Sequence, residues 1–400
     1  MAGRRILLLH VTTSSGHHHA SQAIAQALRR LDPDCQIINV DAFDYTSRFV
    51  RFAIQRSYHS LIRHQPNVWE YLYDNPAIHA QVRQLRRLLH RYHTNKLRRL
   101  IETVQPHAIA CTQAFPCGML ADFKQQQRLD VPLVSVLTDY APHLYWLHEQ
   151  VTAYVVPAEE LKARFISYHV PEDRIHVHGI PVEPSFLEPV DRETVYDRFH
   201  LRRREPLILV MGGGGGFGPV RELMRSLDQV HLPCQFVVLA GTNHALLSWL
   251  RQQSFRHHVV STGYVESVPE LMEIASLIIS KPGGLTTAET LTKRLPMLMS
   301  SPIPGQEMCN ARFLLAHDAA VQLTSPASAR DAVQQLLQQP DRLAQLRRNA
   351  GRLAYPESAF HTARLLVELA DRTIRLSGDQ DIRISGNRDT GVSVPDVLIT

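Results

Sequence analysis

Short apolar runs alternate with segments of helical periodicity at the start of the chain. The run RRILLLHV (4–11) has the length and apolar character of a buried strand. The segment ASQAIAQALRRL (20–31) places Ala23 and Ala27 on one side of a helix. A second strand is predicted over CQIINVDAF (35–43). Because strand, helix and strand in this order form the unit of a parallel sheet, the opening of the chain predicts an α/β fold.

The same alternation occurs twice along the chain. Further strands of the first series are predicted over 107–113, 131–139, 153–157 and 174–179. A second series has strands over 206–213, 235–241, 258–265, 276–282 and 295–301, again separated by helices. Two successive series of similar size predict two Rossmann-like domains.

The chain therefore divides into four predicted parts. The N-terminal domain is expected over 1–177 and the C-terminal domain over 199–376. The segment between them, 178–198, is predicted to be a linker because its prolines interrupt helices and sheet ladders. The final stretch, 377–400, is polar and rich in Gly and Asp, and we expect a poorly ordered tail there.

The composition favours a cytoplasmic protein that folds without disulfides or a zinc site. With 400 residues, 44% of them hydrophobic, the chain is long enough to build two cores. Its five cysteines are scattered and form no C-x-x-C pair, which favours a reducing compartment. The first apolar run leads into TTSSGHHHA instead of a cleavage site, so we interpret it as a strand, with a signal peptide as the alternative. No stretch approaches the ~18 apolar residues of a transmembrane helix.

Positive charge is concentrated in one segment. The formal net charge is only +5, but 79–104 carries seven basic residues against the single acid Glu102. Such a run suits an anionic surface, either lipid or nucleic acid, and a solvated helix face explains it equally well. Because no aromatic-rich recognition module accompanies it, no nucleic-acid partner is expected.

A helix predicted over 47–64 has two faces of different character. One face, expected to contact the core, carries Val50, Ile54, Tyr58 and Leu61. The other face combines arginine with phenylalanine: Arg48, Phe49, Phe52 and Arg56. Arginine beside phenylalanine on an exposed face is typical of an interfacial helix near anionic lipid. An ordinary helix packed against 79–104 is the alternative.

The stretch KPGGLTTAE (281–289) interrupts a predicted strand with two glycines and then begins a helix. The unpaired N–H groups and positive dipole end of a helix favour a bound phosphate, and glycine allows close approach. A plain strand-to-helix turn with Thr286 or Thr287 as the N-cap is an equal alternative.

Two further motifs also follow predicted strands. The loop MGGGGGFG (211–218) permits close approach of its backbone to a ligand, which favours a phosphate or nucleotide loop over a merely flexible one. It lacks the Lys-Ser/Thr of a Walker loop, and no acid follows the next strand, so NTP hydrolysis and hydride transfer are disfavoured. In TTSSGHHHAS (12–21), His17 to His19 point about 100° apart on one helix and are poor joint metal ligands. One of them, aimed at the cleft, is better suited to act as a general base near neutral pH.

A resemblance to a known family rests on segments that occur in family order: TTSSGHHHASQAIAQAL, LTDYAPHLYWLHEQVTAYVV, MGGGGGFG, TGYV, SKPGGLTTAET and SPIPGQEMCNA. Together they resemble the processive diacylglycerol glycosyltransferases and the plant-type monogalactosyldiacylglycerol synthases. These are related to the transferase that adds N-acetylglucosamine to the peptidoglycan lipid carrier. The resemblance covers roughly 5–370 and implies a GT-B fold, in which two Rossmann-like domains face each other across a cleft. The C-terminal half would hold a UDP-sugar and the N-terminal half the lipid acceptor.

The resemblance also implies which residues hold the donor. The glycine loop would face the diphosphate, the start of the 284–289 helix the phosphates and ribose, and the segment after 305 the sugar hydroxyls. The backbone of Val265 would pair with uracil. The implied donor residues are Gly212, Gly213, Gly214, Gly215, Gly216, Val265, Gly284, Leu285, Thr286, Glu289, Gln306 and Glu307, with Asn310 nearby.

For catalysis, the resemblance maps the general base onto His17, although Ser14 stands where the family has the first glycine of its G-x-G-H pattern. Asp139 would orient or replace that base, or would simply cap the end of a strand. His143 and Trp146 are assigned to the acceptor side, with simple packing as the alternative for Trp146.

The resemblance thus implies an inverting glycosyltransferase that moves a hexose from a UDP-sugar to diacylglycerol or a glycolipid. It would act at an anionic membrane surface, on the inner face of the membrane. Because N–H dipoles would stabilise the departing diphosphate, neither a cofactor nor a metal is expected. The alternatives are a UDP-sugar epimerase of the same architecture, a glycosyltransferase acting on a polyprenyl-linked lipid, and a non-catalytic binding protein that keeps the fold.

Overall fold

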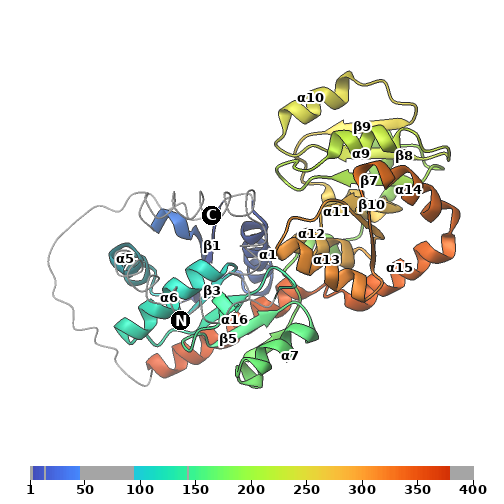
Figure 1. Cartoon of the computed structure of the whole chain (residues 1–400). Helices are drawn as coiled ribbons and strands as arrows, with labels where there is room; N and C mark the ends of the chain where they lie inside the picture. Colours follow the sequence, from blue (N-terminus) through green and yellow to red (C-terminus); the bar gives the residue numbers. More distant parts are fainter. Residues whose placement is uncertain (1–2, 13–14, 46–93, 142–143, 379–400) are drawn as a thin grey trace.

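The computed structural model describes residues 3–12, 15–45, 94–141 and 144–378 of the chain. In this part of the chain the strands form two sheets of six, and each strand pairs in parallel with its neighbours. Figure 1 shows the two sheets side by side, each flanked by helices. The predicted α/β fold with two Rossmann-like units is therefore confirmed.

The N-terminal sheet has the strand order β2-β1-β3-β4-β5-β6. Its strands are β1 (Arg5–His10), β2 (Gln36–Asp41), β3 (Ala108–Cys111), β4 (Leu133–Val136), β5 (Ala153–Val156) and β6 (Ile175–Val177). Its helices include α1 (Gly16–Leu31), α5 (Thr94–Val104), α6 (Ala114–Gln127) and α7 (Glu159–Ser167). Helix α1 begins earlier than predicted because Ser15 is its N-cap and accepts a hydrogen bond from the backbone N–H of His18.

The C-terminal sheet has the order β12-β11-β10-β7-β8-β9. Its strands are β7 (Leu207–Met211), β8 (Gln235–Leu239), β9 (His258–Thr262), β10 (Leu277–Ser280), β11 (Met297–Met299) and β12 (Ala320–Gln322). Its helices are α9 (Val220–Leu227), α10 (His244–Gln252), α11 (Val268–Ile274), α12 (Gly284–Thr292), α13 (Gln306–Ala316), α14 (Ala329–Gln338) and α15 (Pro340–Leu353). Strand β12 was not predicted, since three residues at a sheet edge give almost no periodic signal.

Alternate side chains of β1 enter two different cores. Ile6 and Leu8 pack with α1 on one face of the sheet, while Leu7 and Leu9 enter the core on the other face. All four side chains are fully buried. A parallel strand covered on both faces needs such an uninterrupted apolar run, which is why these strands are readable in the sequence.

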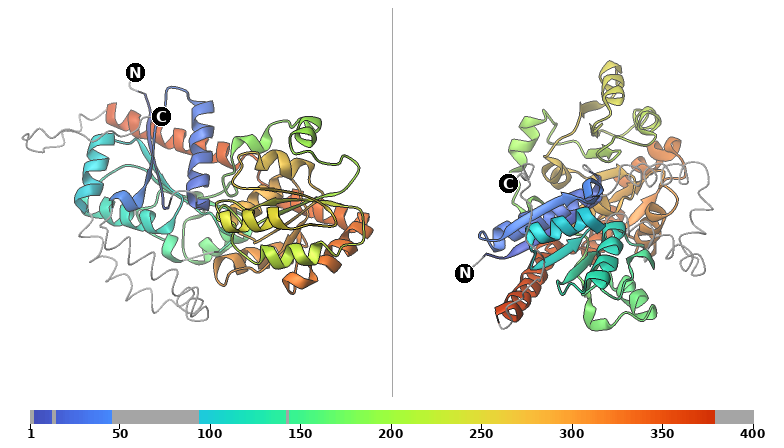
Figure 2. Two further views of the ribbon diagram at one scale, coloured as in Figure 1. Left: turned by 90° about the horizontal axis from the view of Figure 1, so that it is seen from above. Right: turned by 90° about the vertical axis from the view of Figure 1, so that its left-hand side faces the viewer.

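The last helix, α16 (Ser358–Gly378), returns to the N-terminal domain. Its buried residues Ala359, Ala363 and Leu366 belong to the core that contains β1 and α1. Figure 2 shows this red helix lying along the N-terminal sheet. The C-terminal domain predicted over 199–376 is therefore corrected: α16 buries its apolar face on the other domain. The helix also reaches two residues into the predicted tail, of which 379–400 lie outside the described residues.

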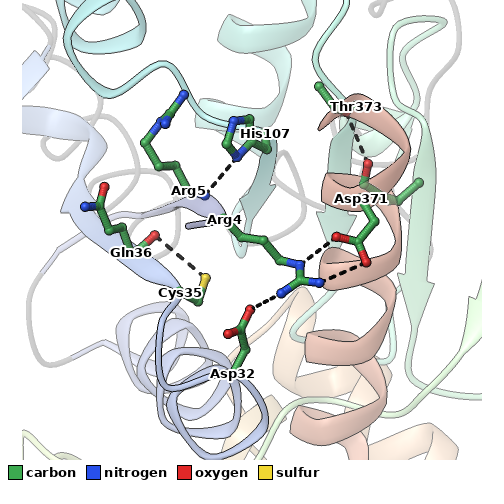
Figure 3. A network of polar contacts seen from close by, with 9 residues as sticks. Arg4, Arg5, Asp32, Cys35, Gln36, His107, Asp371 and Thr373 are labelled. Atoms are coloured by element: carbon green, nitrogen blue, oxygen red, sulfur yellow. Dashed lines mark hydrogen bonds and ion pairs between the residues drawn. The ribbon is translucent and has the colours of Figure 1, made fainter. Parts of the chain in front are cut away.

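Arg4 joins this helix to the start of the chain. Its Nη1 lies 2.7 Å from Oδ2 of Asp32, at the end of α1, and its Nε lies 2.7 Å from Oδ1 of Asp371 in α16. Figure 3 shows the guanidinium between the two carboxylates. The hydrogen bond from Arg4 holds the pKa of Asp371 below its ordinary range. Each of these partly exposed pairs contributes about 0.2–1 kcal/mol to stability.

The predicted linker, 178–198, contains regular structure as well as an extended path. A short 3-10 helix, η4 (Pro184–Leu187), is followed by α8 (Arg192–Arg198), which packs against α11. Asp191 caps α8 by accepting from backbone N–H groups, and Val195 is buried. Among the helices that the structure describes, none combines the length and apolar character needed to cross a membrane.

Candidate active site

A cleft of about 920 Å³ lies between the two domains. Its walls come from the segments that follow β1 and β4 in one domain and β7, β8, β9 and β10 in the other. The carboxyl ends of parallel strands are the place where open α/β sheets bind ligands. The cleft brings together many of the predicted site residues: His17, Asp139, Gly213, Gly214, Val265, Gly284, Leu285, Thr286, Glu289, Gln306 and Glu307.

Helix α12 begins at the cleft, and its own N-cap residue offers no side-chain acceptor to its first turn. Its N-cap is Gly283, so the alternative in which Thr286 or Thr287 caps the helix is wrong; both lie inside it. The first N–H groups of a helix have no intrahelical acceptor, and Leu285 and Thr286 line the cleft. The amides of Leu285 and Thr286 are therefore the first-turn donors that can face an anion at this helix N-terminus.

Gly284 is a point of very close contact between the domains. A Cβ added there would lie 1.8 Å from the carbonyl oxygen of Thr138. The N–H of Gly284 donates a hydrogen bond to Asp139. Glycine at this position is therefore required by contact with the N-terminal domain, and its amide serves Asp139.

Asn310 completes this contact between the domains. Its Nδ2 donates to Oδ1 of Asp139, 3.0 Å away, and to the carbonyl of Pro282, 2.9 Å away. Its Oδ1 accepts a 2.7 Å hydrogen bond from the N–H of Tyr140. Asn310 is fully buried and does not line the cleft, so it lies behind the site and orders its wall.

Asp139 is half-buried between the two domains. Burial raises its pKa to about 7, against the lowering effect of the hydrogen bond from Asn310, and the nearby Glu307 raises it as well. Asp139 thus exchanges a proton near neutral pH while it caps α12.

His17 sits at the start of α1 with one ring nitrogen fixed. Its Nδ1 lies 2.9 Å from the carbonyl oxygen of Thr112 and 2.8 Å from Oγ1 of Thr138. Because a carbonyl only accepts, Nδ1 carries the proton and donates it, which leaves Nε2 unprotonated. Burial lowers the pKa of His17 to about 4, so the ring is neutral at pH 7. A neutral imidazole with a fixed tautomer can accept a proton at Nε2, although the lowered pKa makes it a weaker base than a free imidazole.

The orienting role predicted for Asp139 thus falls to Thr112 and Thr138. Both threonines are buried, and Oγ1 of Thr112 also donates to the carbonyl of His17 at 2.8 Å. Sequence reasoning did not find them, because a backbone carbonyl that orients a histidine leaves no signature in residue type.

Only part of the glycine loop reaches the cleft. Gly213 and Gly214 line it, whereas Gly212, Gly215 and Gly216 do not. The loop closes on itself through hydrogen bonds from the N–H of Gly216 to the carbonyl of Gly213 and from that of Phe217 to Gly212. Gly216 has φ +59°, and a Cβ there would lie 2.0 Å from the carbonyl of Ala240. These three glycines shape the turn that presents the other two.

Two carboxylates from different parts of the chain line the cleft together. Glu289 lies in α12, and Glu183 comes from the predicted linker, with Oε1 3.6 Å from Nδ1 of His19. Burial and the charge of Glu183 raise the pKa of Glu289 to about 8. Glu183 was not predicted to be a site residue; an acid in a proline-rich segment carries no pattern that assigns it a role.

The segment before α13 is fixed by Glu307. Its Oε1 lies 3.0 Å from Nζ of Lys281, and its Oε2 accepts a 2.8 Å hydrogen bond from the N–H of Ile303. Gly305 has φ +97°, a value that favours glycine and that turns the chain into the helix. Gln306 and Glu307 therefore reach the cleft from a well-braced turn, and Lys281 is a partner that the sequence did not reveal.

Of the residues predicted for the acceptor side, the structure describes only Trp146. Trp146 is 7% exposed and belongs to the core of the N-terminal domain, so its assignment to the acceptor side is corrected in favour of packing. Several others lie outside the described residues: Arg48, Phe49, Phe52, Arg56 and His143. The described end of the basic segment forms α5, which buries Leu97 and Ile101.

Two protein-family models match the chain. The model of monogalactosyldiacylglycerol (MGDG) synthase matches residues 17–182, and that of the glycosyltransferase family 28 C-terminal domain matches 207–357. The first match falls on the N-terminal domain and the second on the C-terminal domain, the two domains that form the cleft.

Two curated relatives are processive diacylglycerol β-glucosyltransferases. The one from Bacillus cytotoxicus is 31% identical over 276 residues, which is 68% of this chain and 70% of the relative. The one from Bacillus cereus strain B4264 is 32% identical over 271 residues, or 66% and 69%.

Solved structures share the architecture at low identity. A MurG from Acinetobacter baumannii has a TM-score of 0.59 and 14% identity, covering 91% of this chain and 99% of that one. The UDP-GlcNAc 2-epimerase from Neisseria meningitidis has a TM-score of 0.57 and 14% identity, covering 92% and 100%. At this identity they show the fold, which confirms the predicted GT-B arrangement.

Proposed function

The chain belongs to the family of the diacylglycerol glucosyltransferases and MGDG synthases, and we propose that it transfers a hexose from a UDP-sugar to diacylglycerol with inversion. Its reaction class follows from this membership: it is a UDP-sugar-dependent glycosyltransferase. The observation that carries the finer proposal is that the neutral His17 and the first-turn residues Leu285 and Thr286 of α12 line the same cleft.

The donor is held by the C-terminal wall. Its diphosphate lies against the first-turn amides of Leu285 and Thr286 and against Gly213 and Gly214, all of which line the cleft. Glu289, one turn further along α12, binds the ribose hydroxyls. Because these N–H dipoles are already in place, they stabilise the negative charge that develops on the departing diphosphate, and no metal is required.

The acceptor hydroxyl is activated from the opposite wall by His17. Its Nε2 removes the proton as the hydroxyl oxygen forms a bond to the anomeric carbon. The bond from that carbon to the diphosphate oxygen breaks, and UDP leaves with its electron pair. Attack from the side opposite the leaving group converts an α-linked donor into a β-glycoside. The Nδ1–H···O=C hydrogen bond to Thr112 becomes stronger when the ring is charged, so it offsets part of the cost of forming a buried imidazolium.

The acceptor requires the enzyme to work at a membrane. Diacylglycerol stays in the bilayer, so we place the protein on the inner membrane surface, in contact with anionic lipid. The segment 47–64, with its arginine and phenylalanine face, is the part of the sequence that supports this placement.

One experiment tests the proposal. The purified full chain is incubated with a panel of UDP-sugars and with phosphatidylcholine vesicles that contain or lack diacylglycerol, and UDP release and product mass and linkage are measured. We expect UDP release only with diacylglycerol, and a β-linked hexosyl-diacylglycerol. Formation of an epimeric UDP-sugar without lipid would establish the epimerase instead. Transfer only to a polyprenyl phosphate acceptor, or no turnover with any donor, would also overturn the proposal.

A further inference from the structure

We propose that a second, basic cavity in the C-terminal domain binds the phosphate group of an anionic molecule. This cavity encloses about 400 Å³ and shares no lining residue with the cleft. It lies where α8, α11, α15 and the C-terminal end of α12 come together. Its charged walls are formed by Arg192, Glu273, Lys293, Arg294, Arg347 and Arg348.

The one acid in this cavity is already neutralised. Glu273 forms an ion pair with Lys293, with 3.0 Å between oxygen and nitrogen, and the lysine side chain is only 6% exposed. The four arginines have no carboxylate within ion-pair distance among the described residues. Other arginines of the domain do, such as Arg342, which pairs with Asp318. The cavity therefore collects four unpaired positive charges that repel one another, and a bound anion would offset that repulsion.

The backbone helps to bring these arginines together. Arg294 follows the end of α12 in a left-handed conformation, with φ 50°. Its side chain runs over Gly351 of α15, where a Cβ would lie 3.2 Å from its Cδ. Arg347 donates to the carbonyl of Ser276, with 3.4 Å between nitrogen and oxygen. At least two of the guanidinium groups are thus positioned by the fold.

The floor of the cavity is apolar. Met272, Ala275 and Leu295 line it and are buried. The four arginines themselves are exposed, so an anion would be held by several guanidinium groups acting together and not by one buried charge. Because guanidinium groups present planar pairs of N–H donors that match phosphate oxygens, phosphate is the anion that this chemistry favours. The source is either a free phosphate compound or the headgroup of a phospholipid.

Isothermal titration of the full chain with inorganic phosphate, in excess UDP, tests binding of the free ion. Sedimentation with phosphatidylcholine vesicles that contain or lack phosphatidylglycerol tests the headgroup. The pocket variant is Arg294→Gln with Arg348→Gln. The matched control is Arg202→Gln with Arg330→Gln, which removes two charges from the same domain at exposed arginines that are ion-paired.

We expect the control to bind as the wild type does and the pocket variant to bind about tenfold more weakly or worse. A second pocket pair, Arg192→Gln with Arg347→Gln, must show the same loss, and thermal melts establish that the variants are folded. Because like charges are removed, we expect the pocket variants to melt no lower than the control in phosphate-free buffer. Equal binding by wild type, pocket variants and control, or no binding of either probe by the wild type, would overturn the proposal. These comparisons do not depend on the proposed transfer reaction, because all variants leave the cleft unchanged.

Discussion

Asn310 donates a hydrogen bond to Asp139 across the domain boundary, with 3.0 Å between Nδ2 and Oδ1. The same amide donates to the carbonyl of Pro282, just before α12, and accepts from the N–H of Tyr140. One buried side chain therefore joins the segment after β4 to the segment that begins α12. This contact between the two walls of the cleft is made by a residue that does not line it.

Replacing Asn310 by alanine removes three hydrogen bonds and leaves buried groups without partners. We expect Asn310→Ala to lower the free energy of unfolding by about 1–3 kcal/mol and to lower transfer activity. Chemical denaturation and UDP release measure the two effects. The control Asn349→Ala removes hydrogen bonds to Asp318 within the C-terminal domain, so activity should stay at the wild-type level. Equal loss of activity in both variants would show that the contact between the domains has no special role.

Adjacent glycines before and within α12 provide a sharper test of the domain contact. At Gly284 a Cβ would meet the backbone of Thr138 at 1.8 Å, whereas at Gly283 no atom lies within 4 Å. We expect Gly284→Ala to lower the unfolding free energy by about 1–3 kcal/mol or more and to abolish most activity, since a backbone contact has to open. Gly283→Ala should cost at most about 1 kcal/mol, the difference between N-cap residues. Thermal melts and turnover of the two variants measure this, and indistinguishable behaviour would contradict the close approach.

His17 is expected to affect catalysis more than binding. His17→Gln keeps a polar side chain of similar reach but removes the basic nitrogen, so kcat should fall by roughly 10²–10⁴-fold while donor affinity stays unchanged. Turnover with diacylglycerol vesicles and UDP titration separate the two quantities. The neighbouring His18 does not line the cleft, and His18→Gln should retain kcat within a small factor. A modest loss in the His17 variant would assign the base to another group.

The strands were predictable because each parallel strand is a continuous apolar run, as in Leu7 to Leu9. The sheet against which a helix packs cannot be predicted in the same way. The pattern of α16 predicts a helix with one apolar face, but it does not say which sheet that face covers. For the same reason the C-terminal boundary at 376 was wrong.

For the site as well, residues within one motif were easier to predict than contacts between the two domains. The order of the motifs placed His17, Glu289 and the glycine loop, because loops after parallel strands meet at one edge. Contacts across the cleft were missed, because they depend on how the two sheets face each other. Gly284 was interpreted as a close approach to phosphate, and the structure shows a close approach to Thr138. Glu183 was assigned no role, since only the fold brings it into the cleft with Glu289.

Chelation should leave transfer unchanged. If the diphosphate is held by first-turn amides of α12, treatment with EDTA and later addition of Mg²⁺ or Mn²⁺ should alter kcat by less than about twofold. Turnover of the chelated enzyme measures this, with a known metal-dependent enzyme as the control for EDTA. Loss of activity that a divalent ion restores would contradict the metal-free mechanism and direct attention to the carboxylates that line the cleft, among them Glu183 and Glu289.

We expect Glu289 to make the folded protein less stable as the pH rises, which is the opposite of the usual effect of a carboxylate. Its pKa is raised from 4.5 to about 8 by burial and by Glu183, so between these values the folded protein holds a proton that the unfolded chain releases. Stability contributed by that proton is present below pH 4.5 and is lost as pH rises toward 8. We expect Glu289→Gln to match the wild type near pH 4.5 and to melt at a higher temperature near pH 8. Glu183→Gln removes one of the two causes and should give an intermediate slope, because burial of Glu289 remains. Parallel melting curves for wild type and Glu289→Gln across this range would show that Glu289 is already ionised in the ligand-free cleft, and that it meets the ribose as a carboxylate.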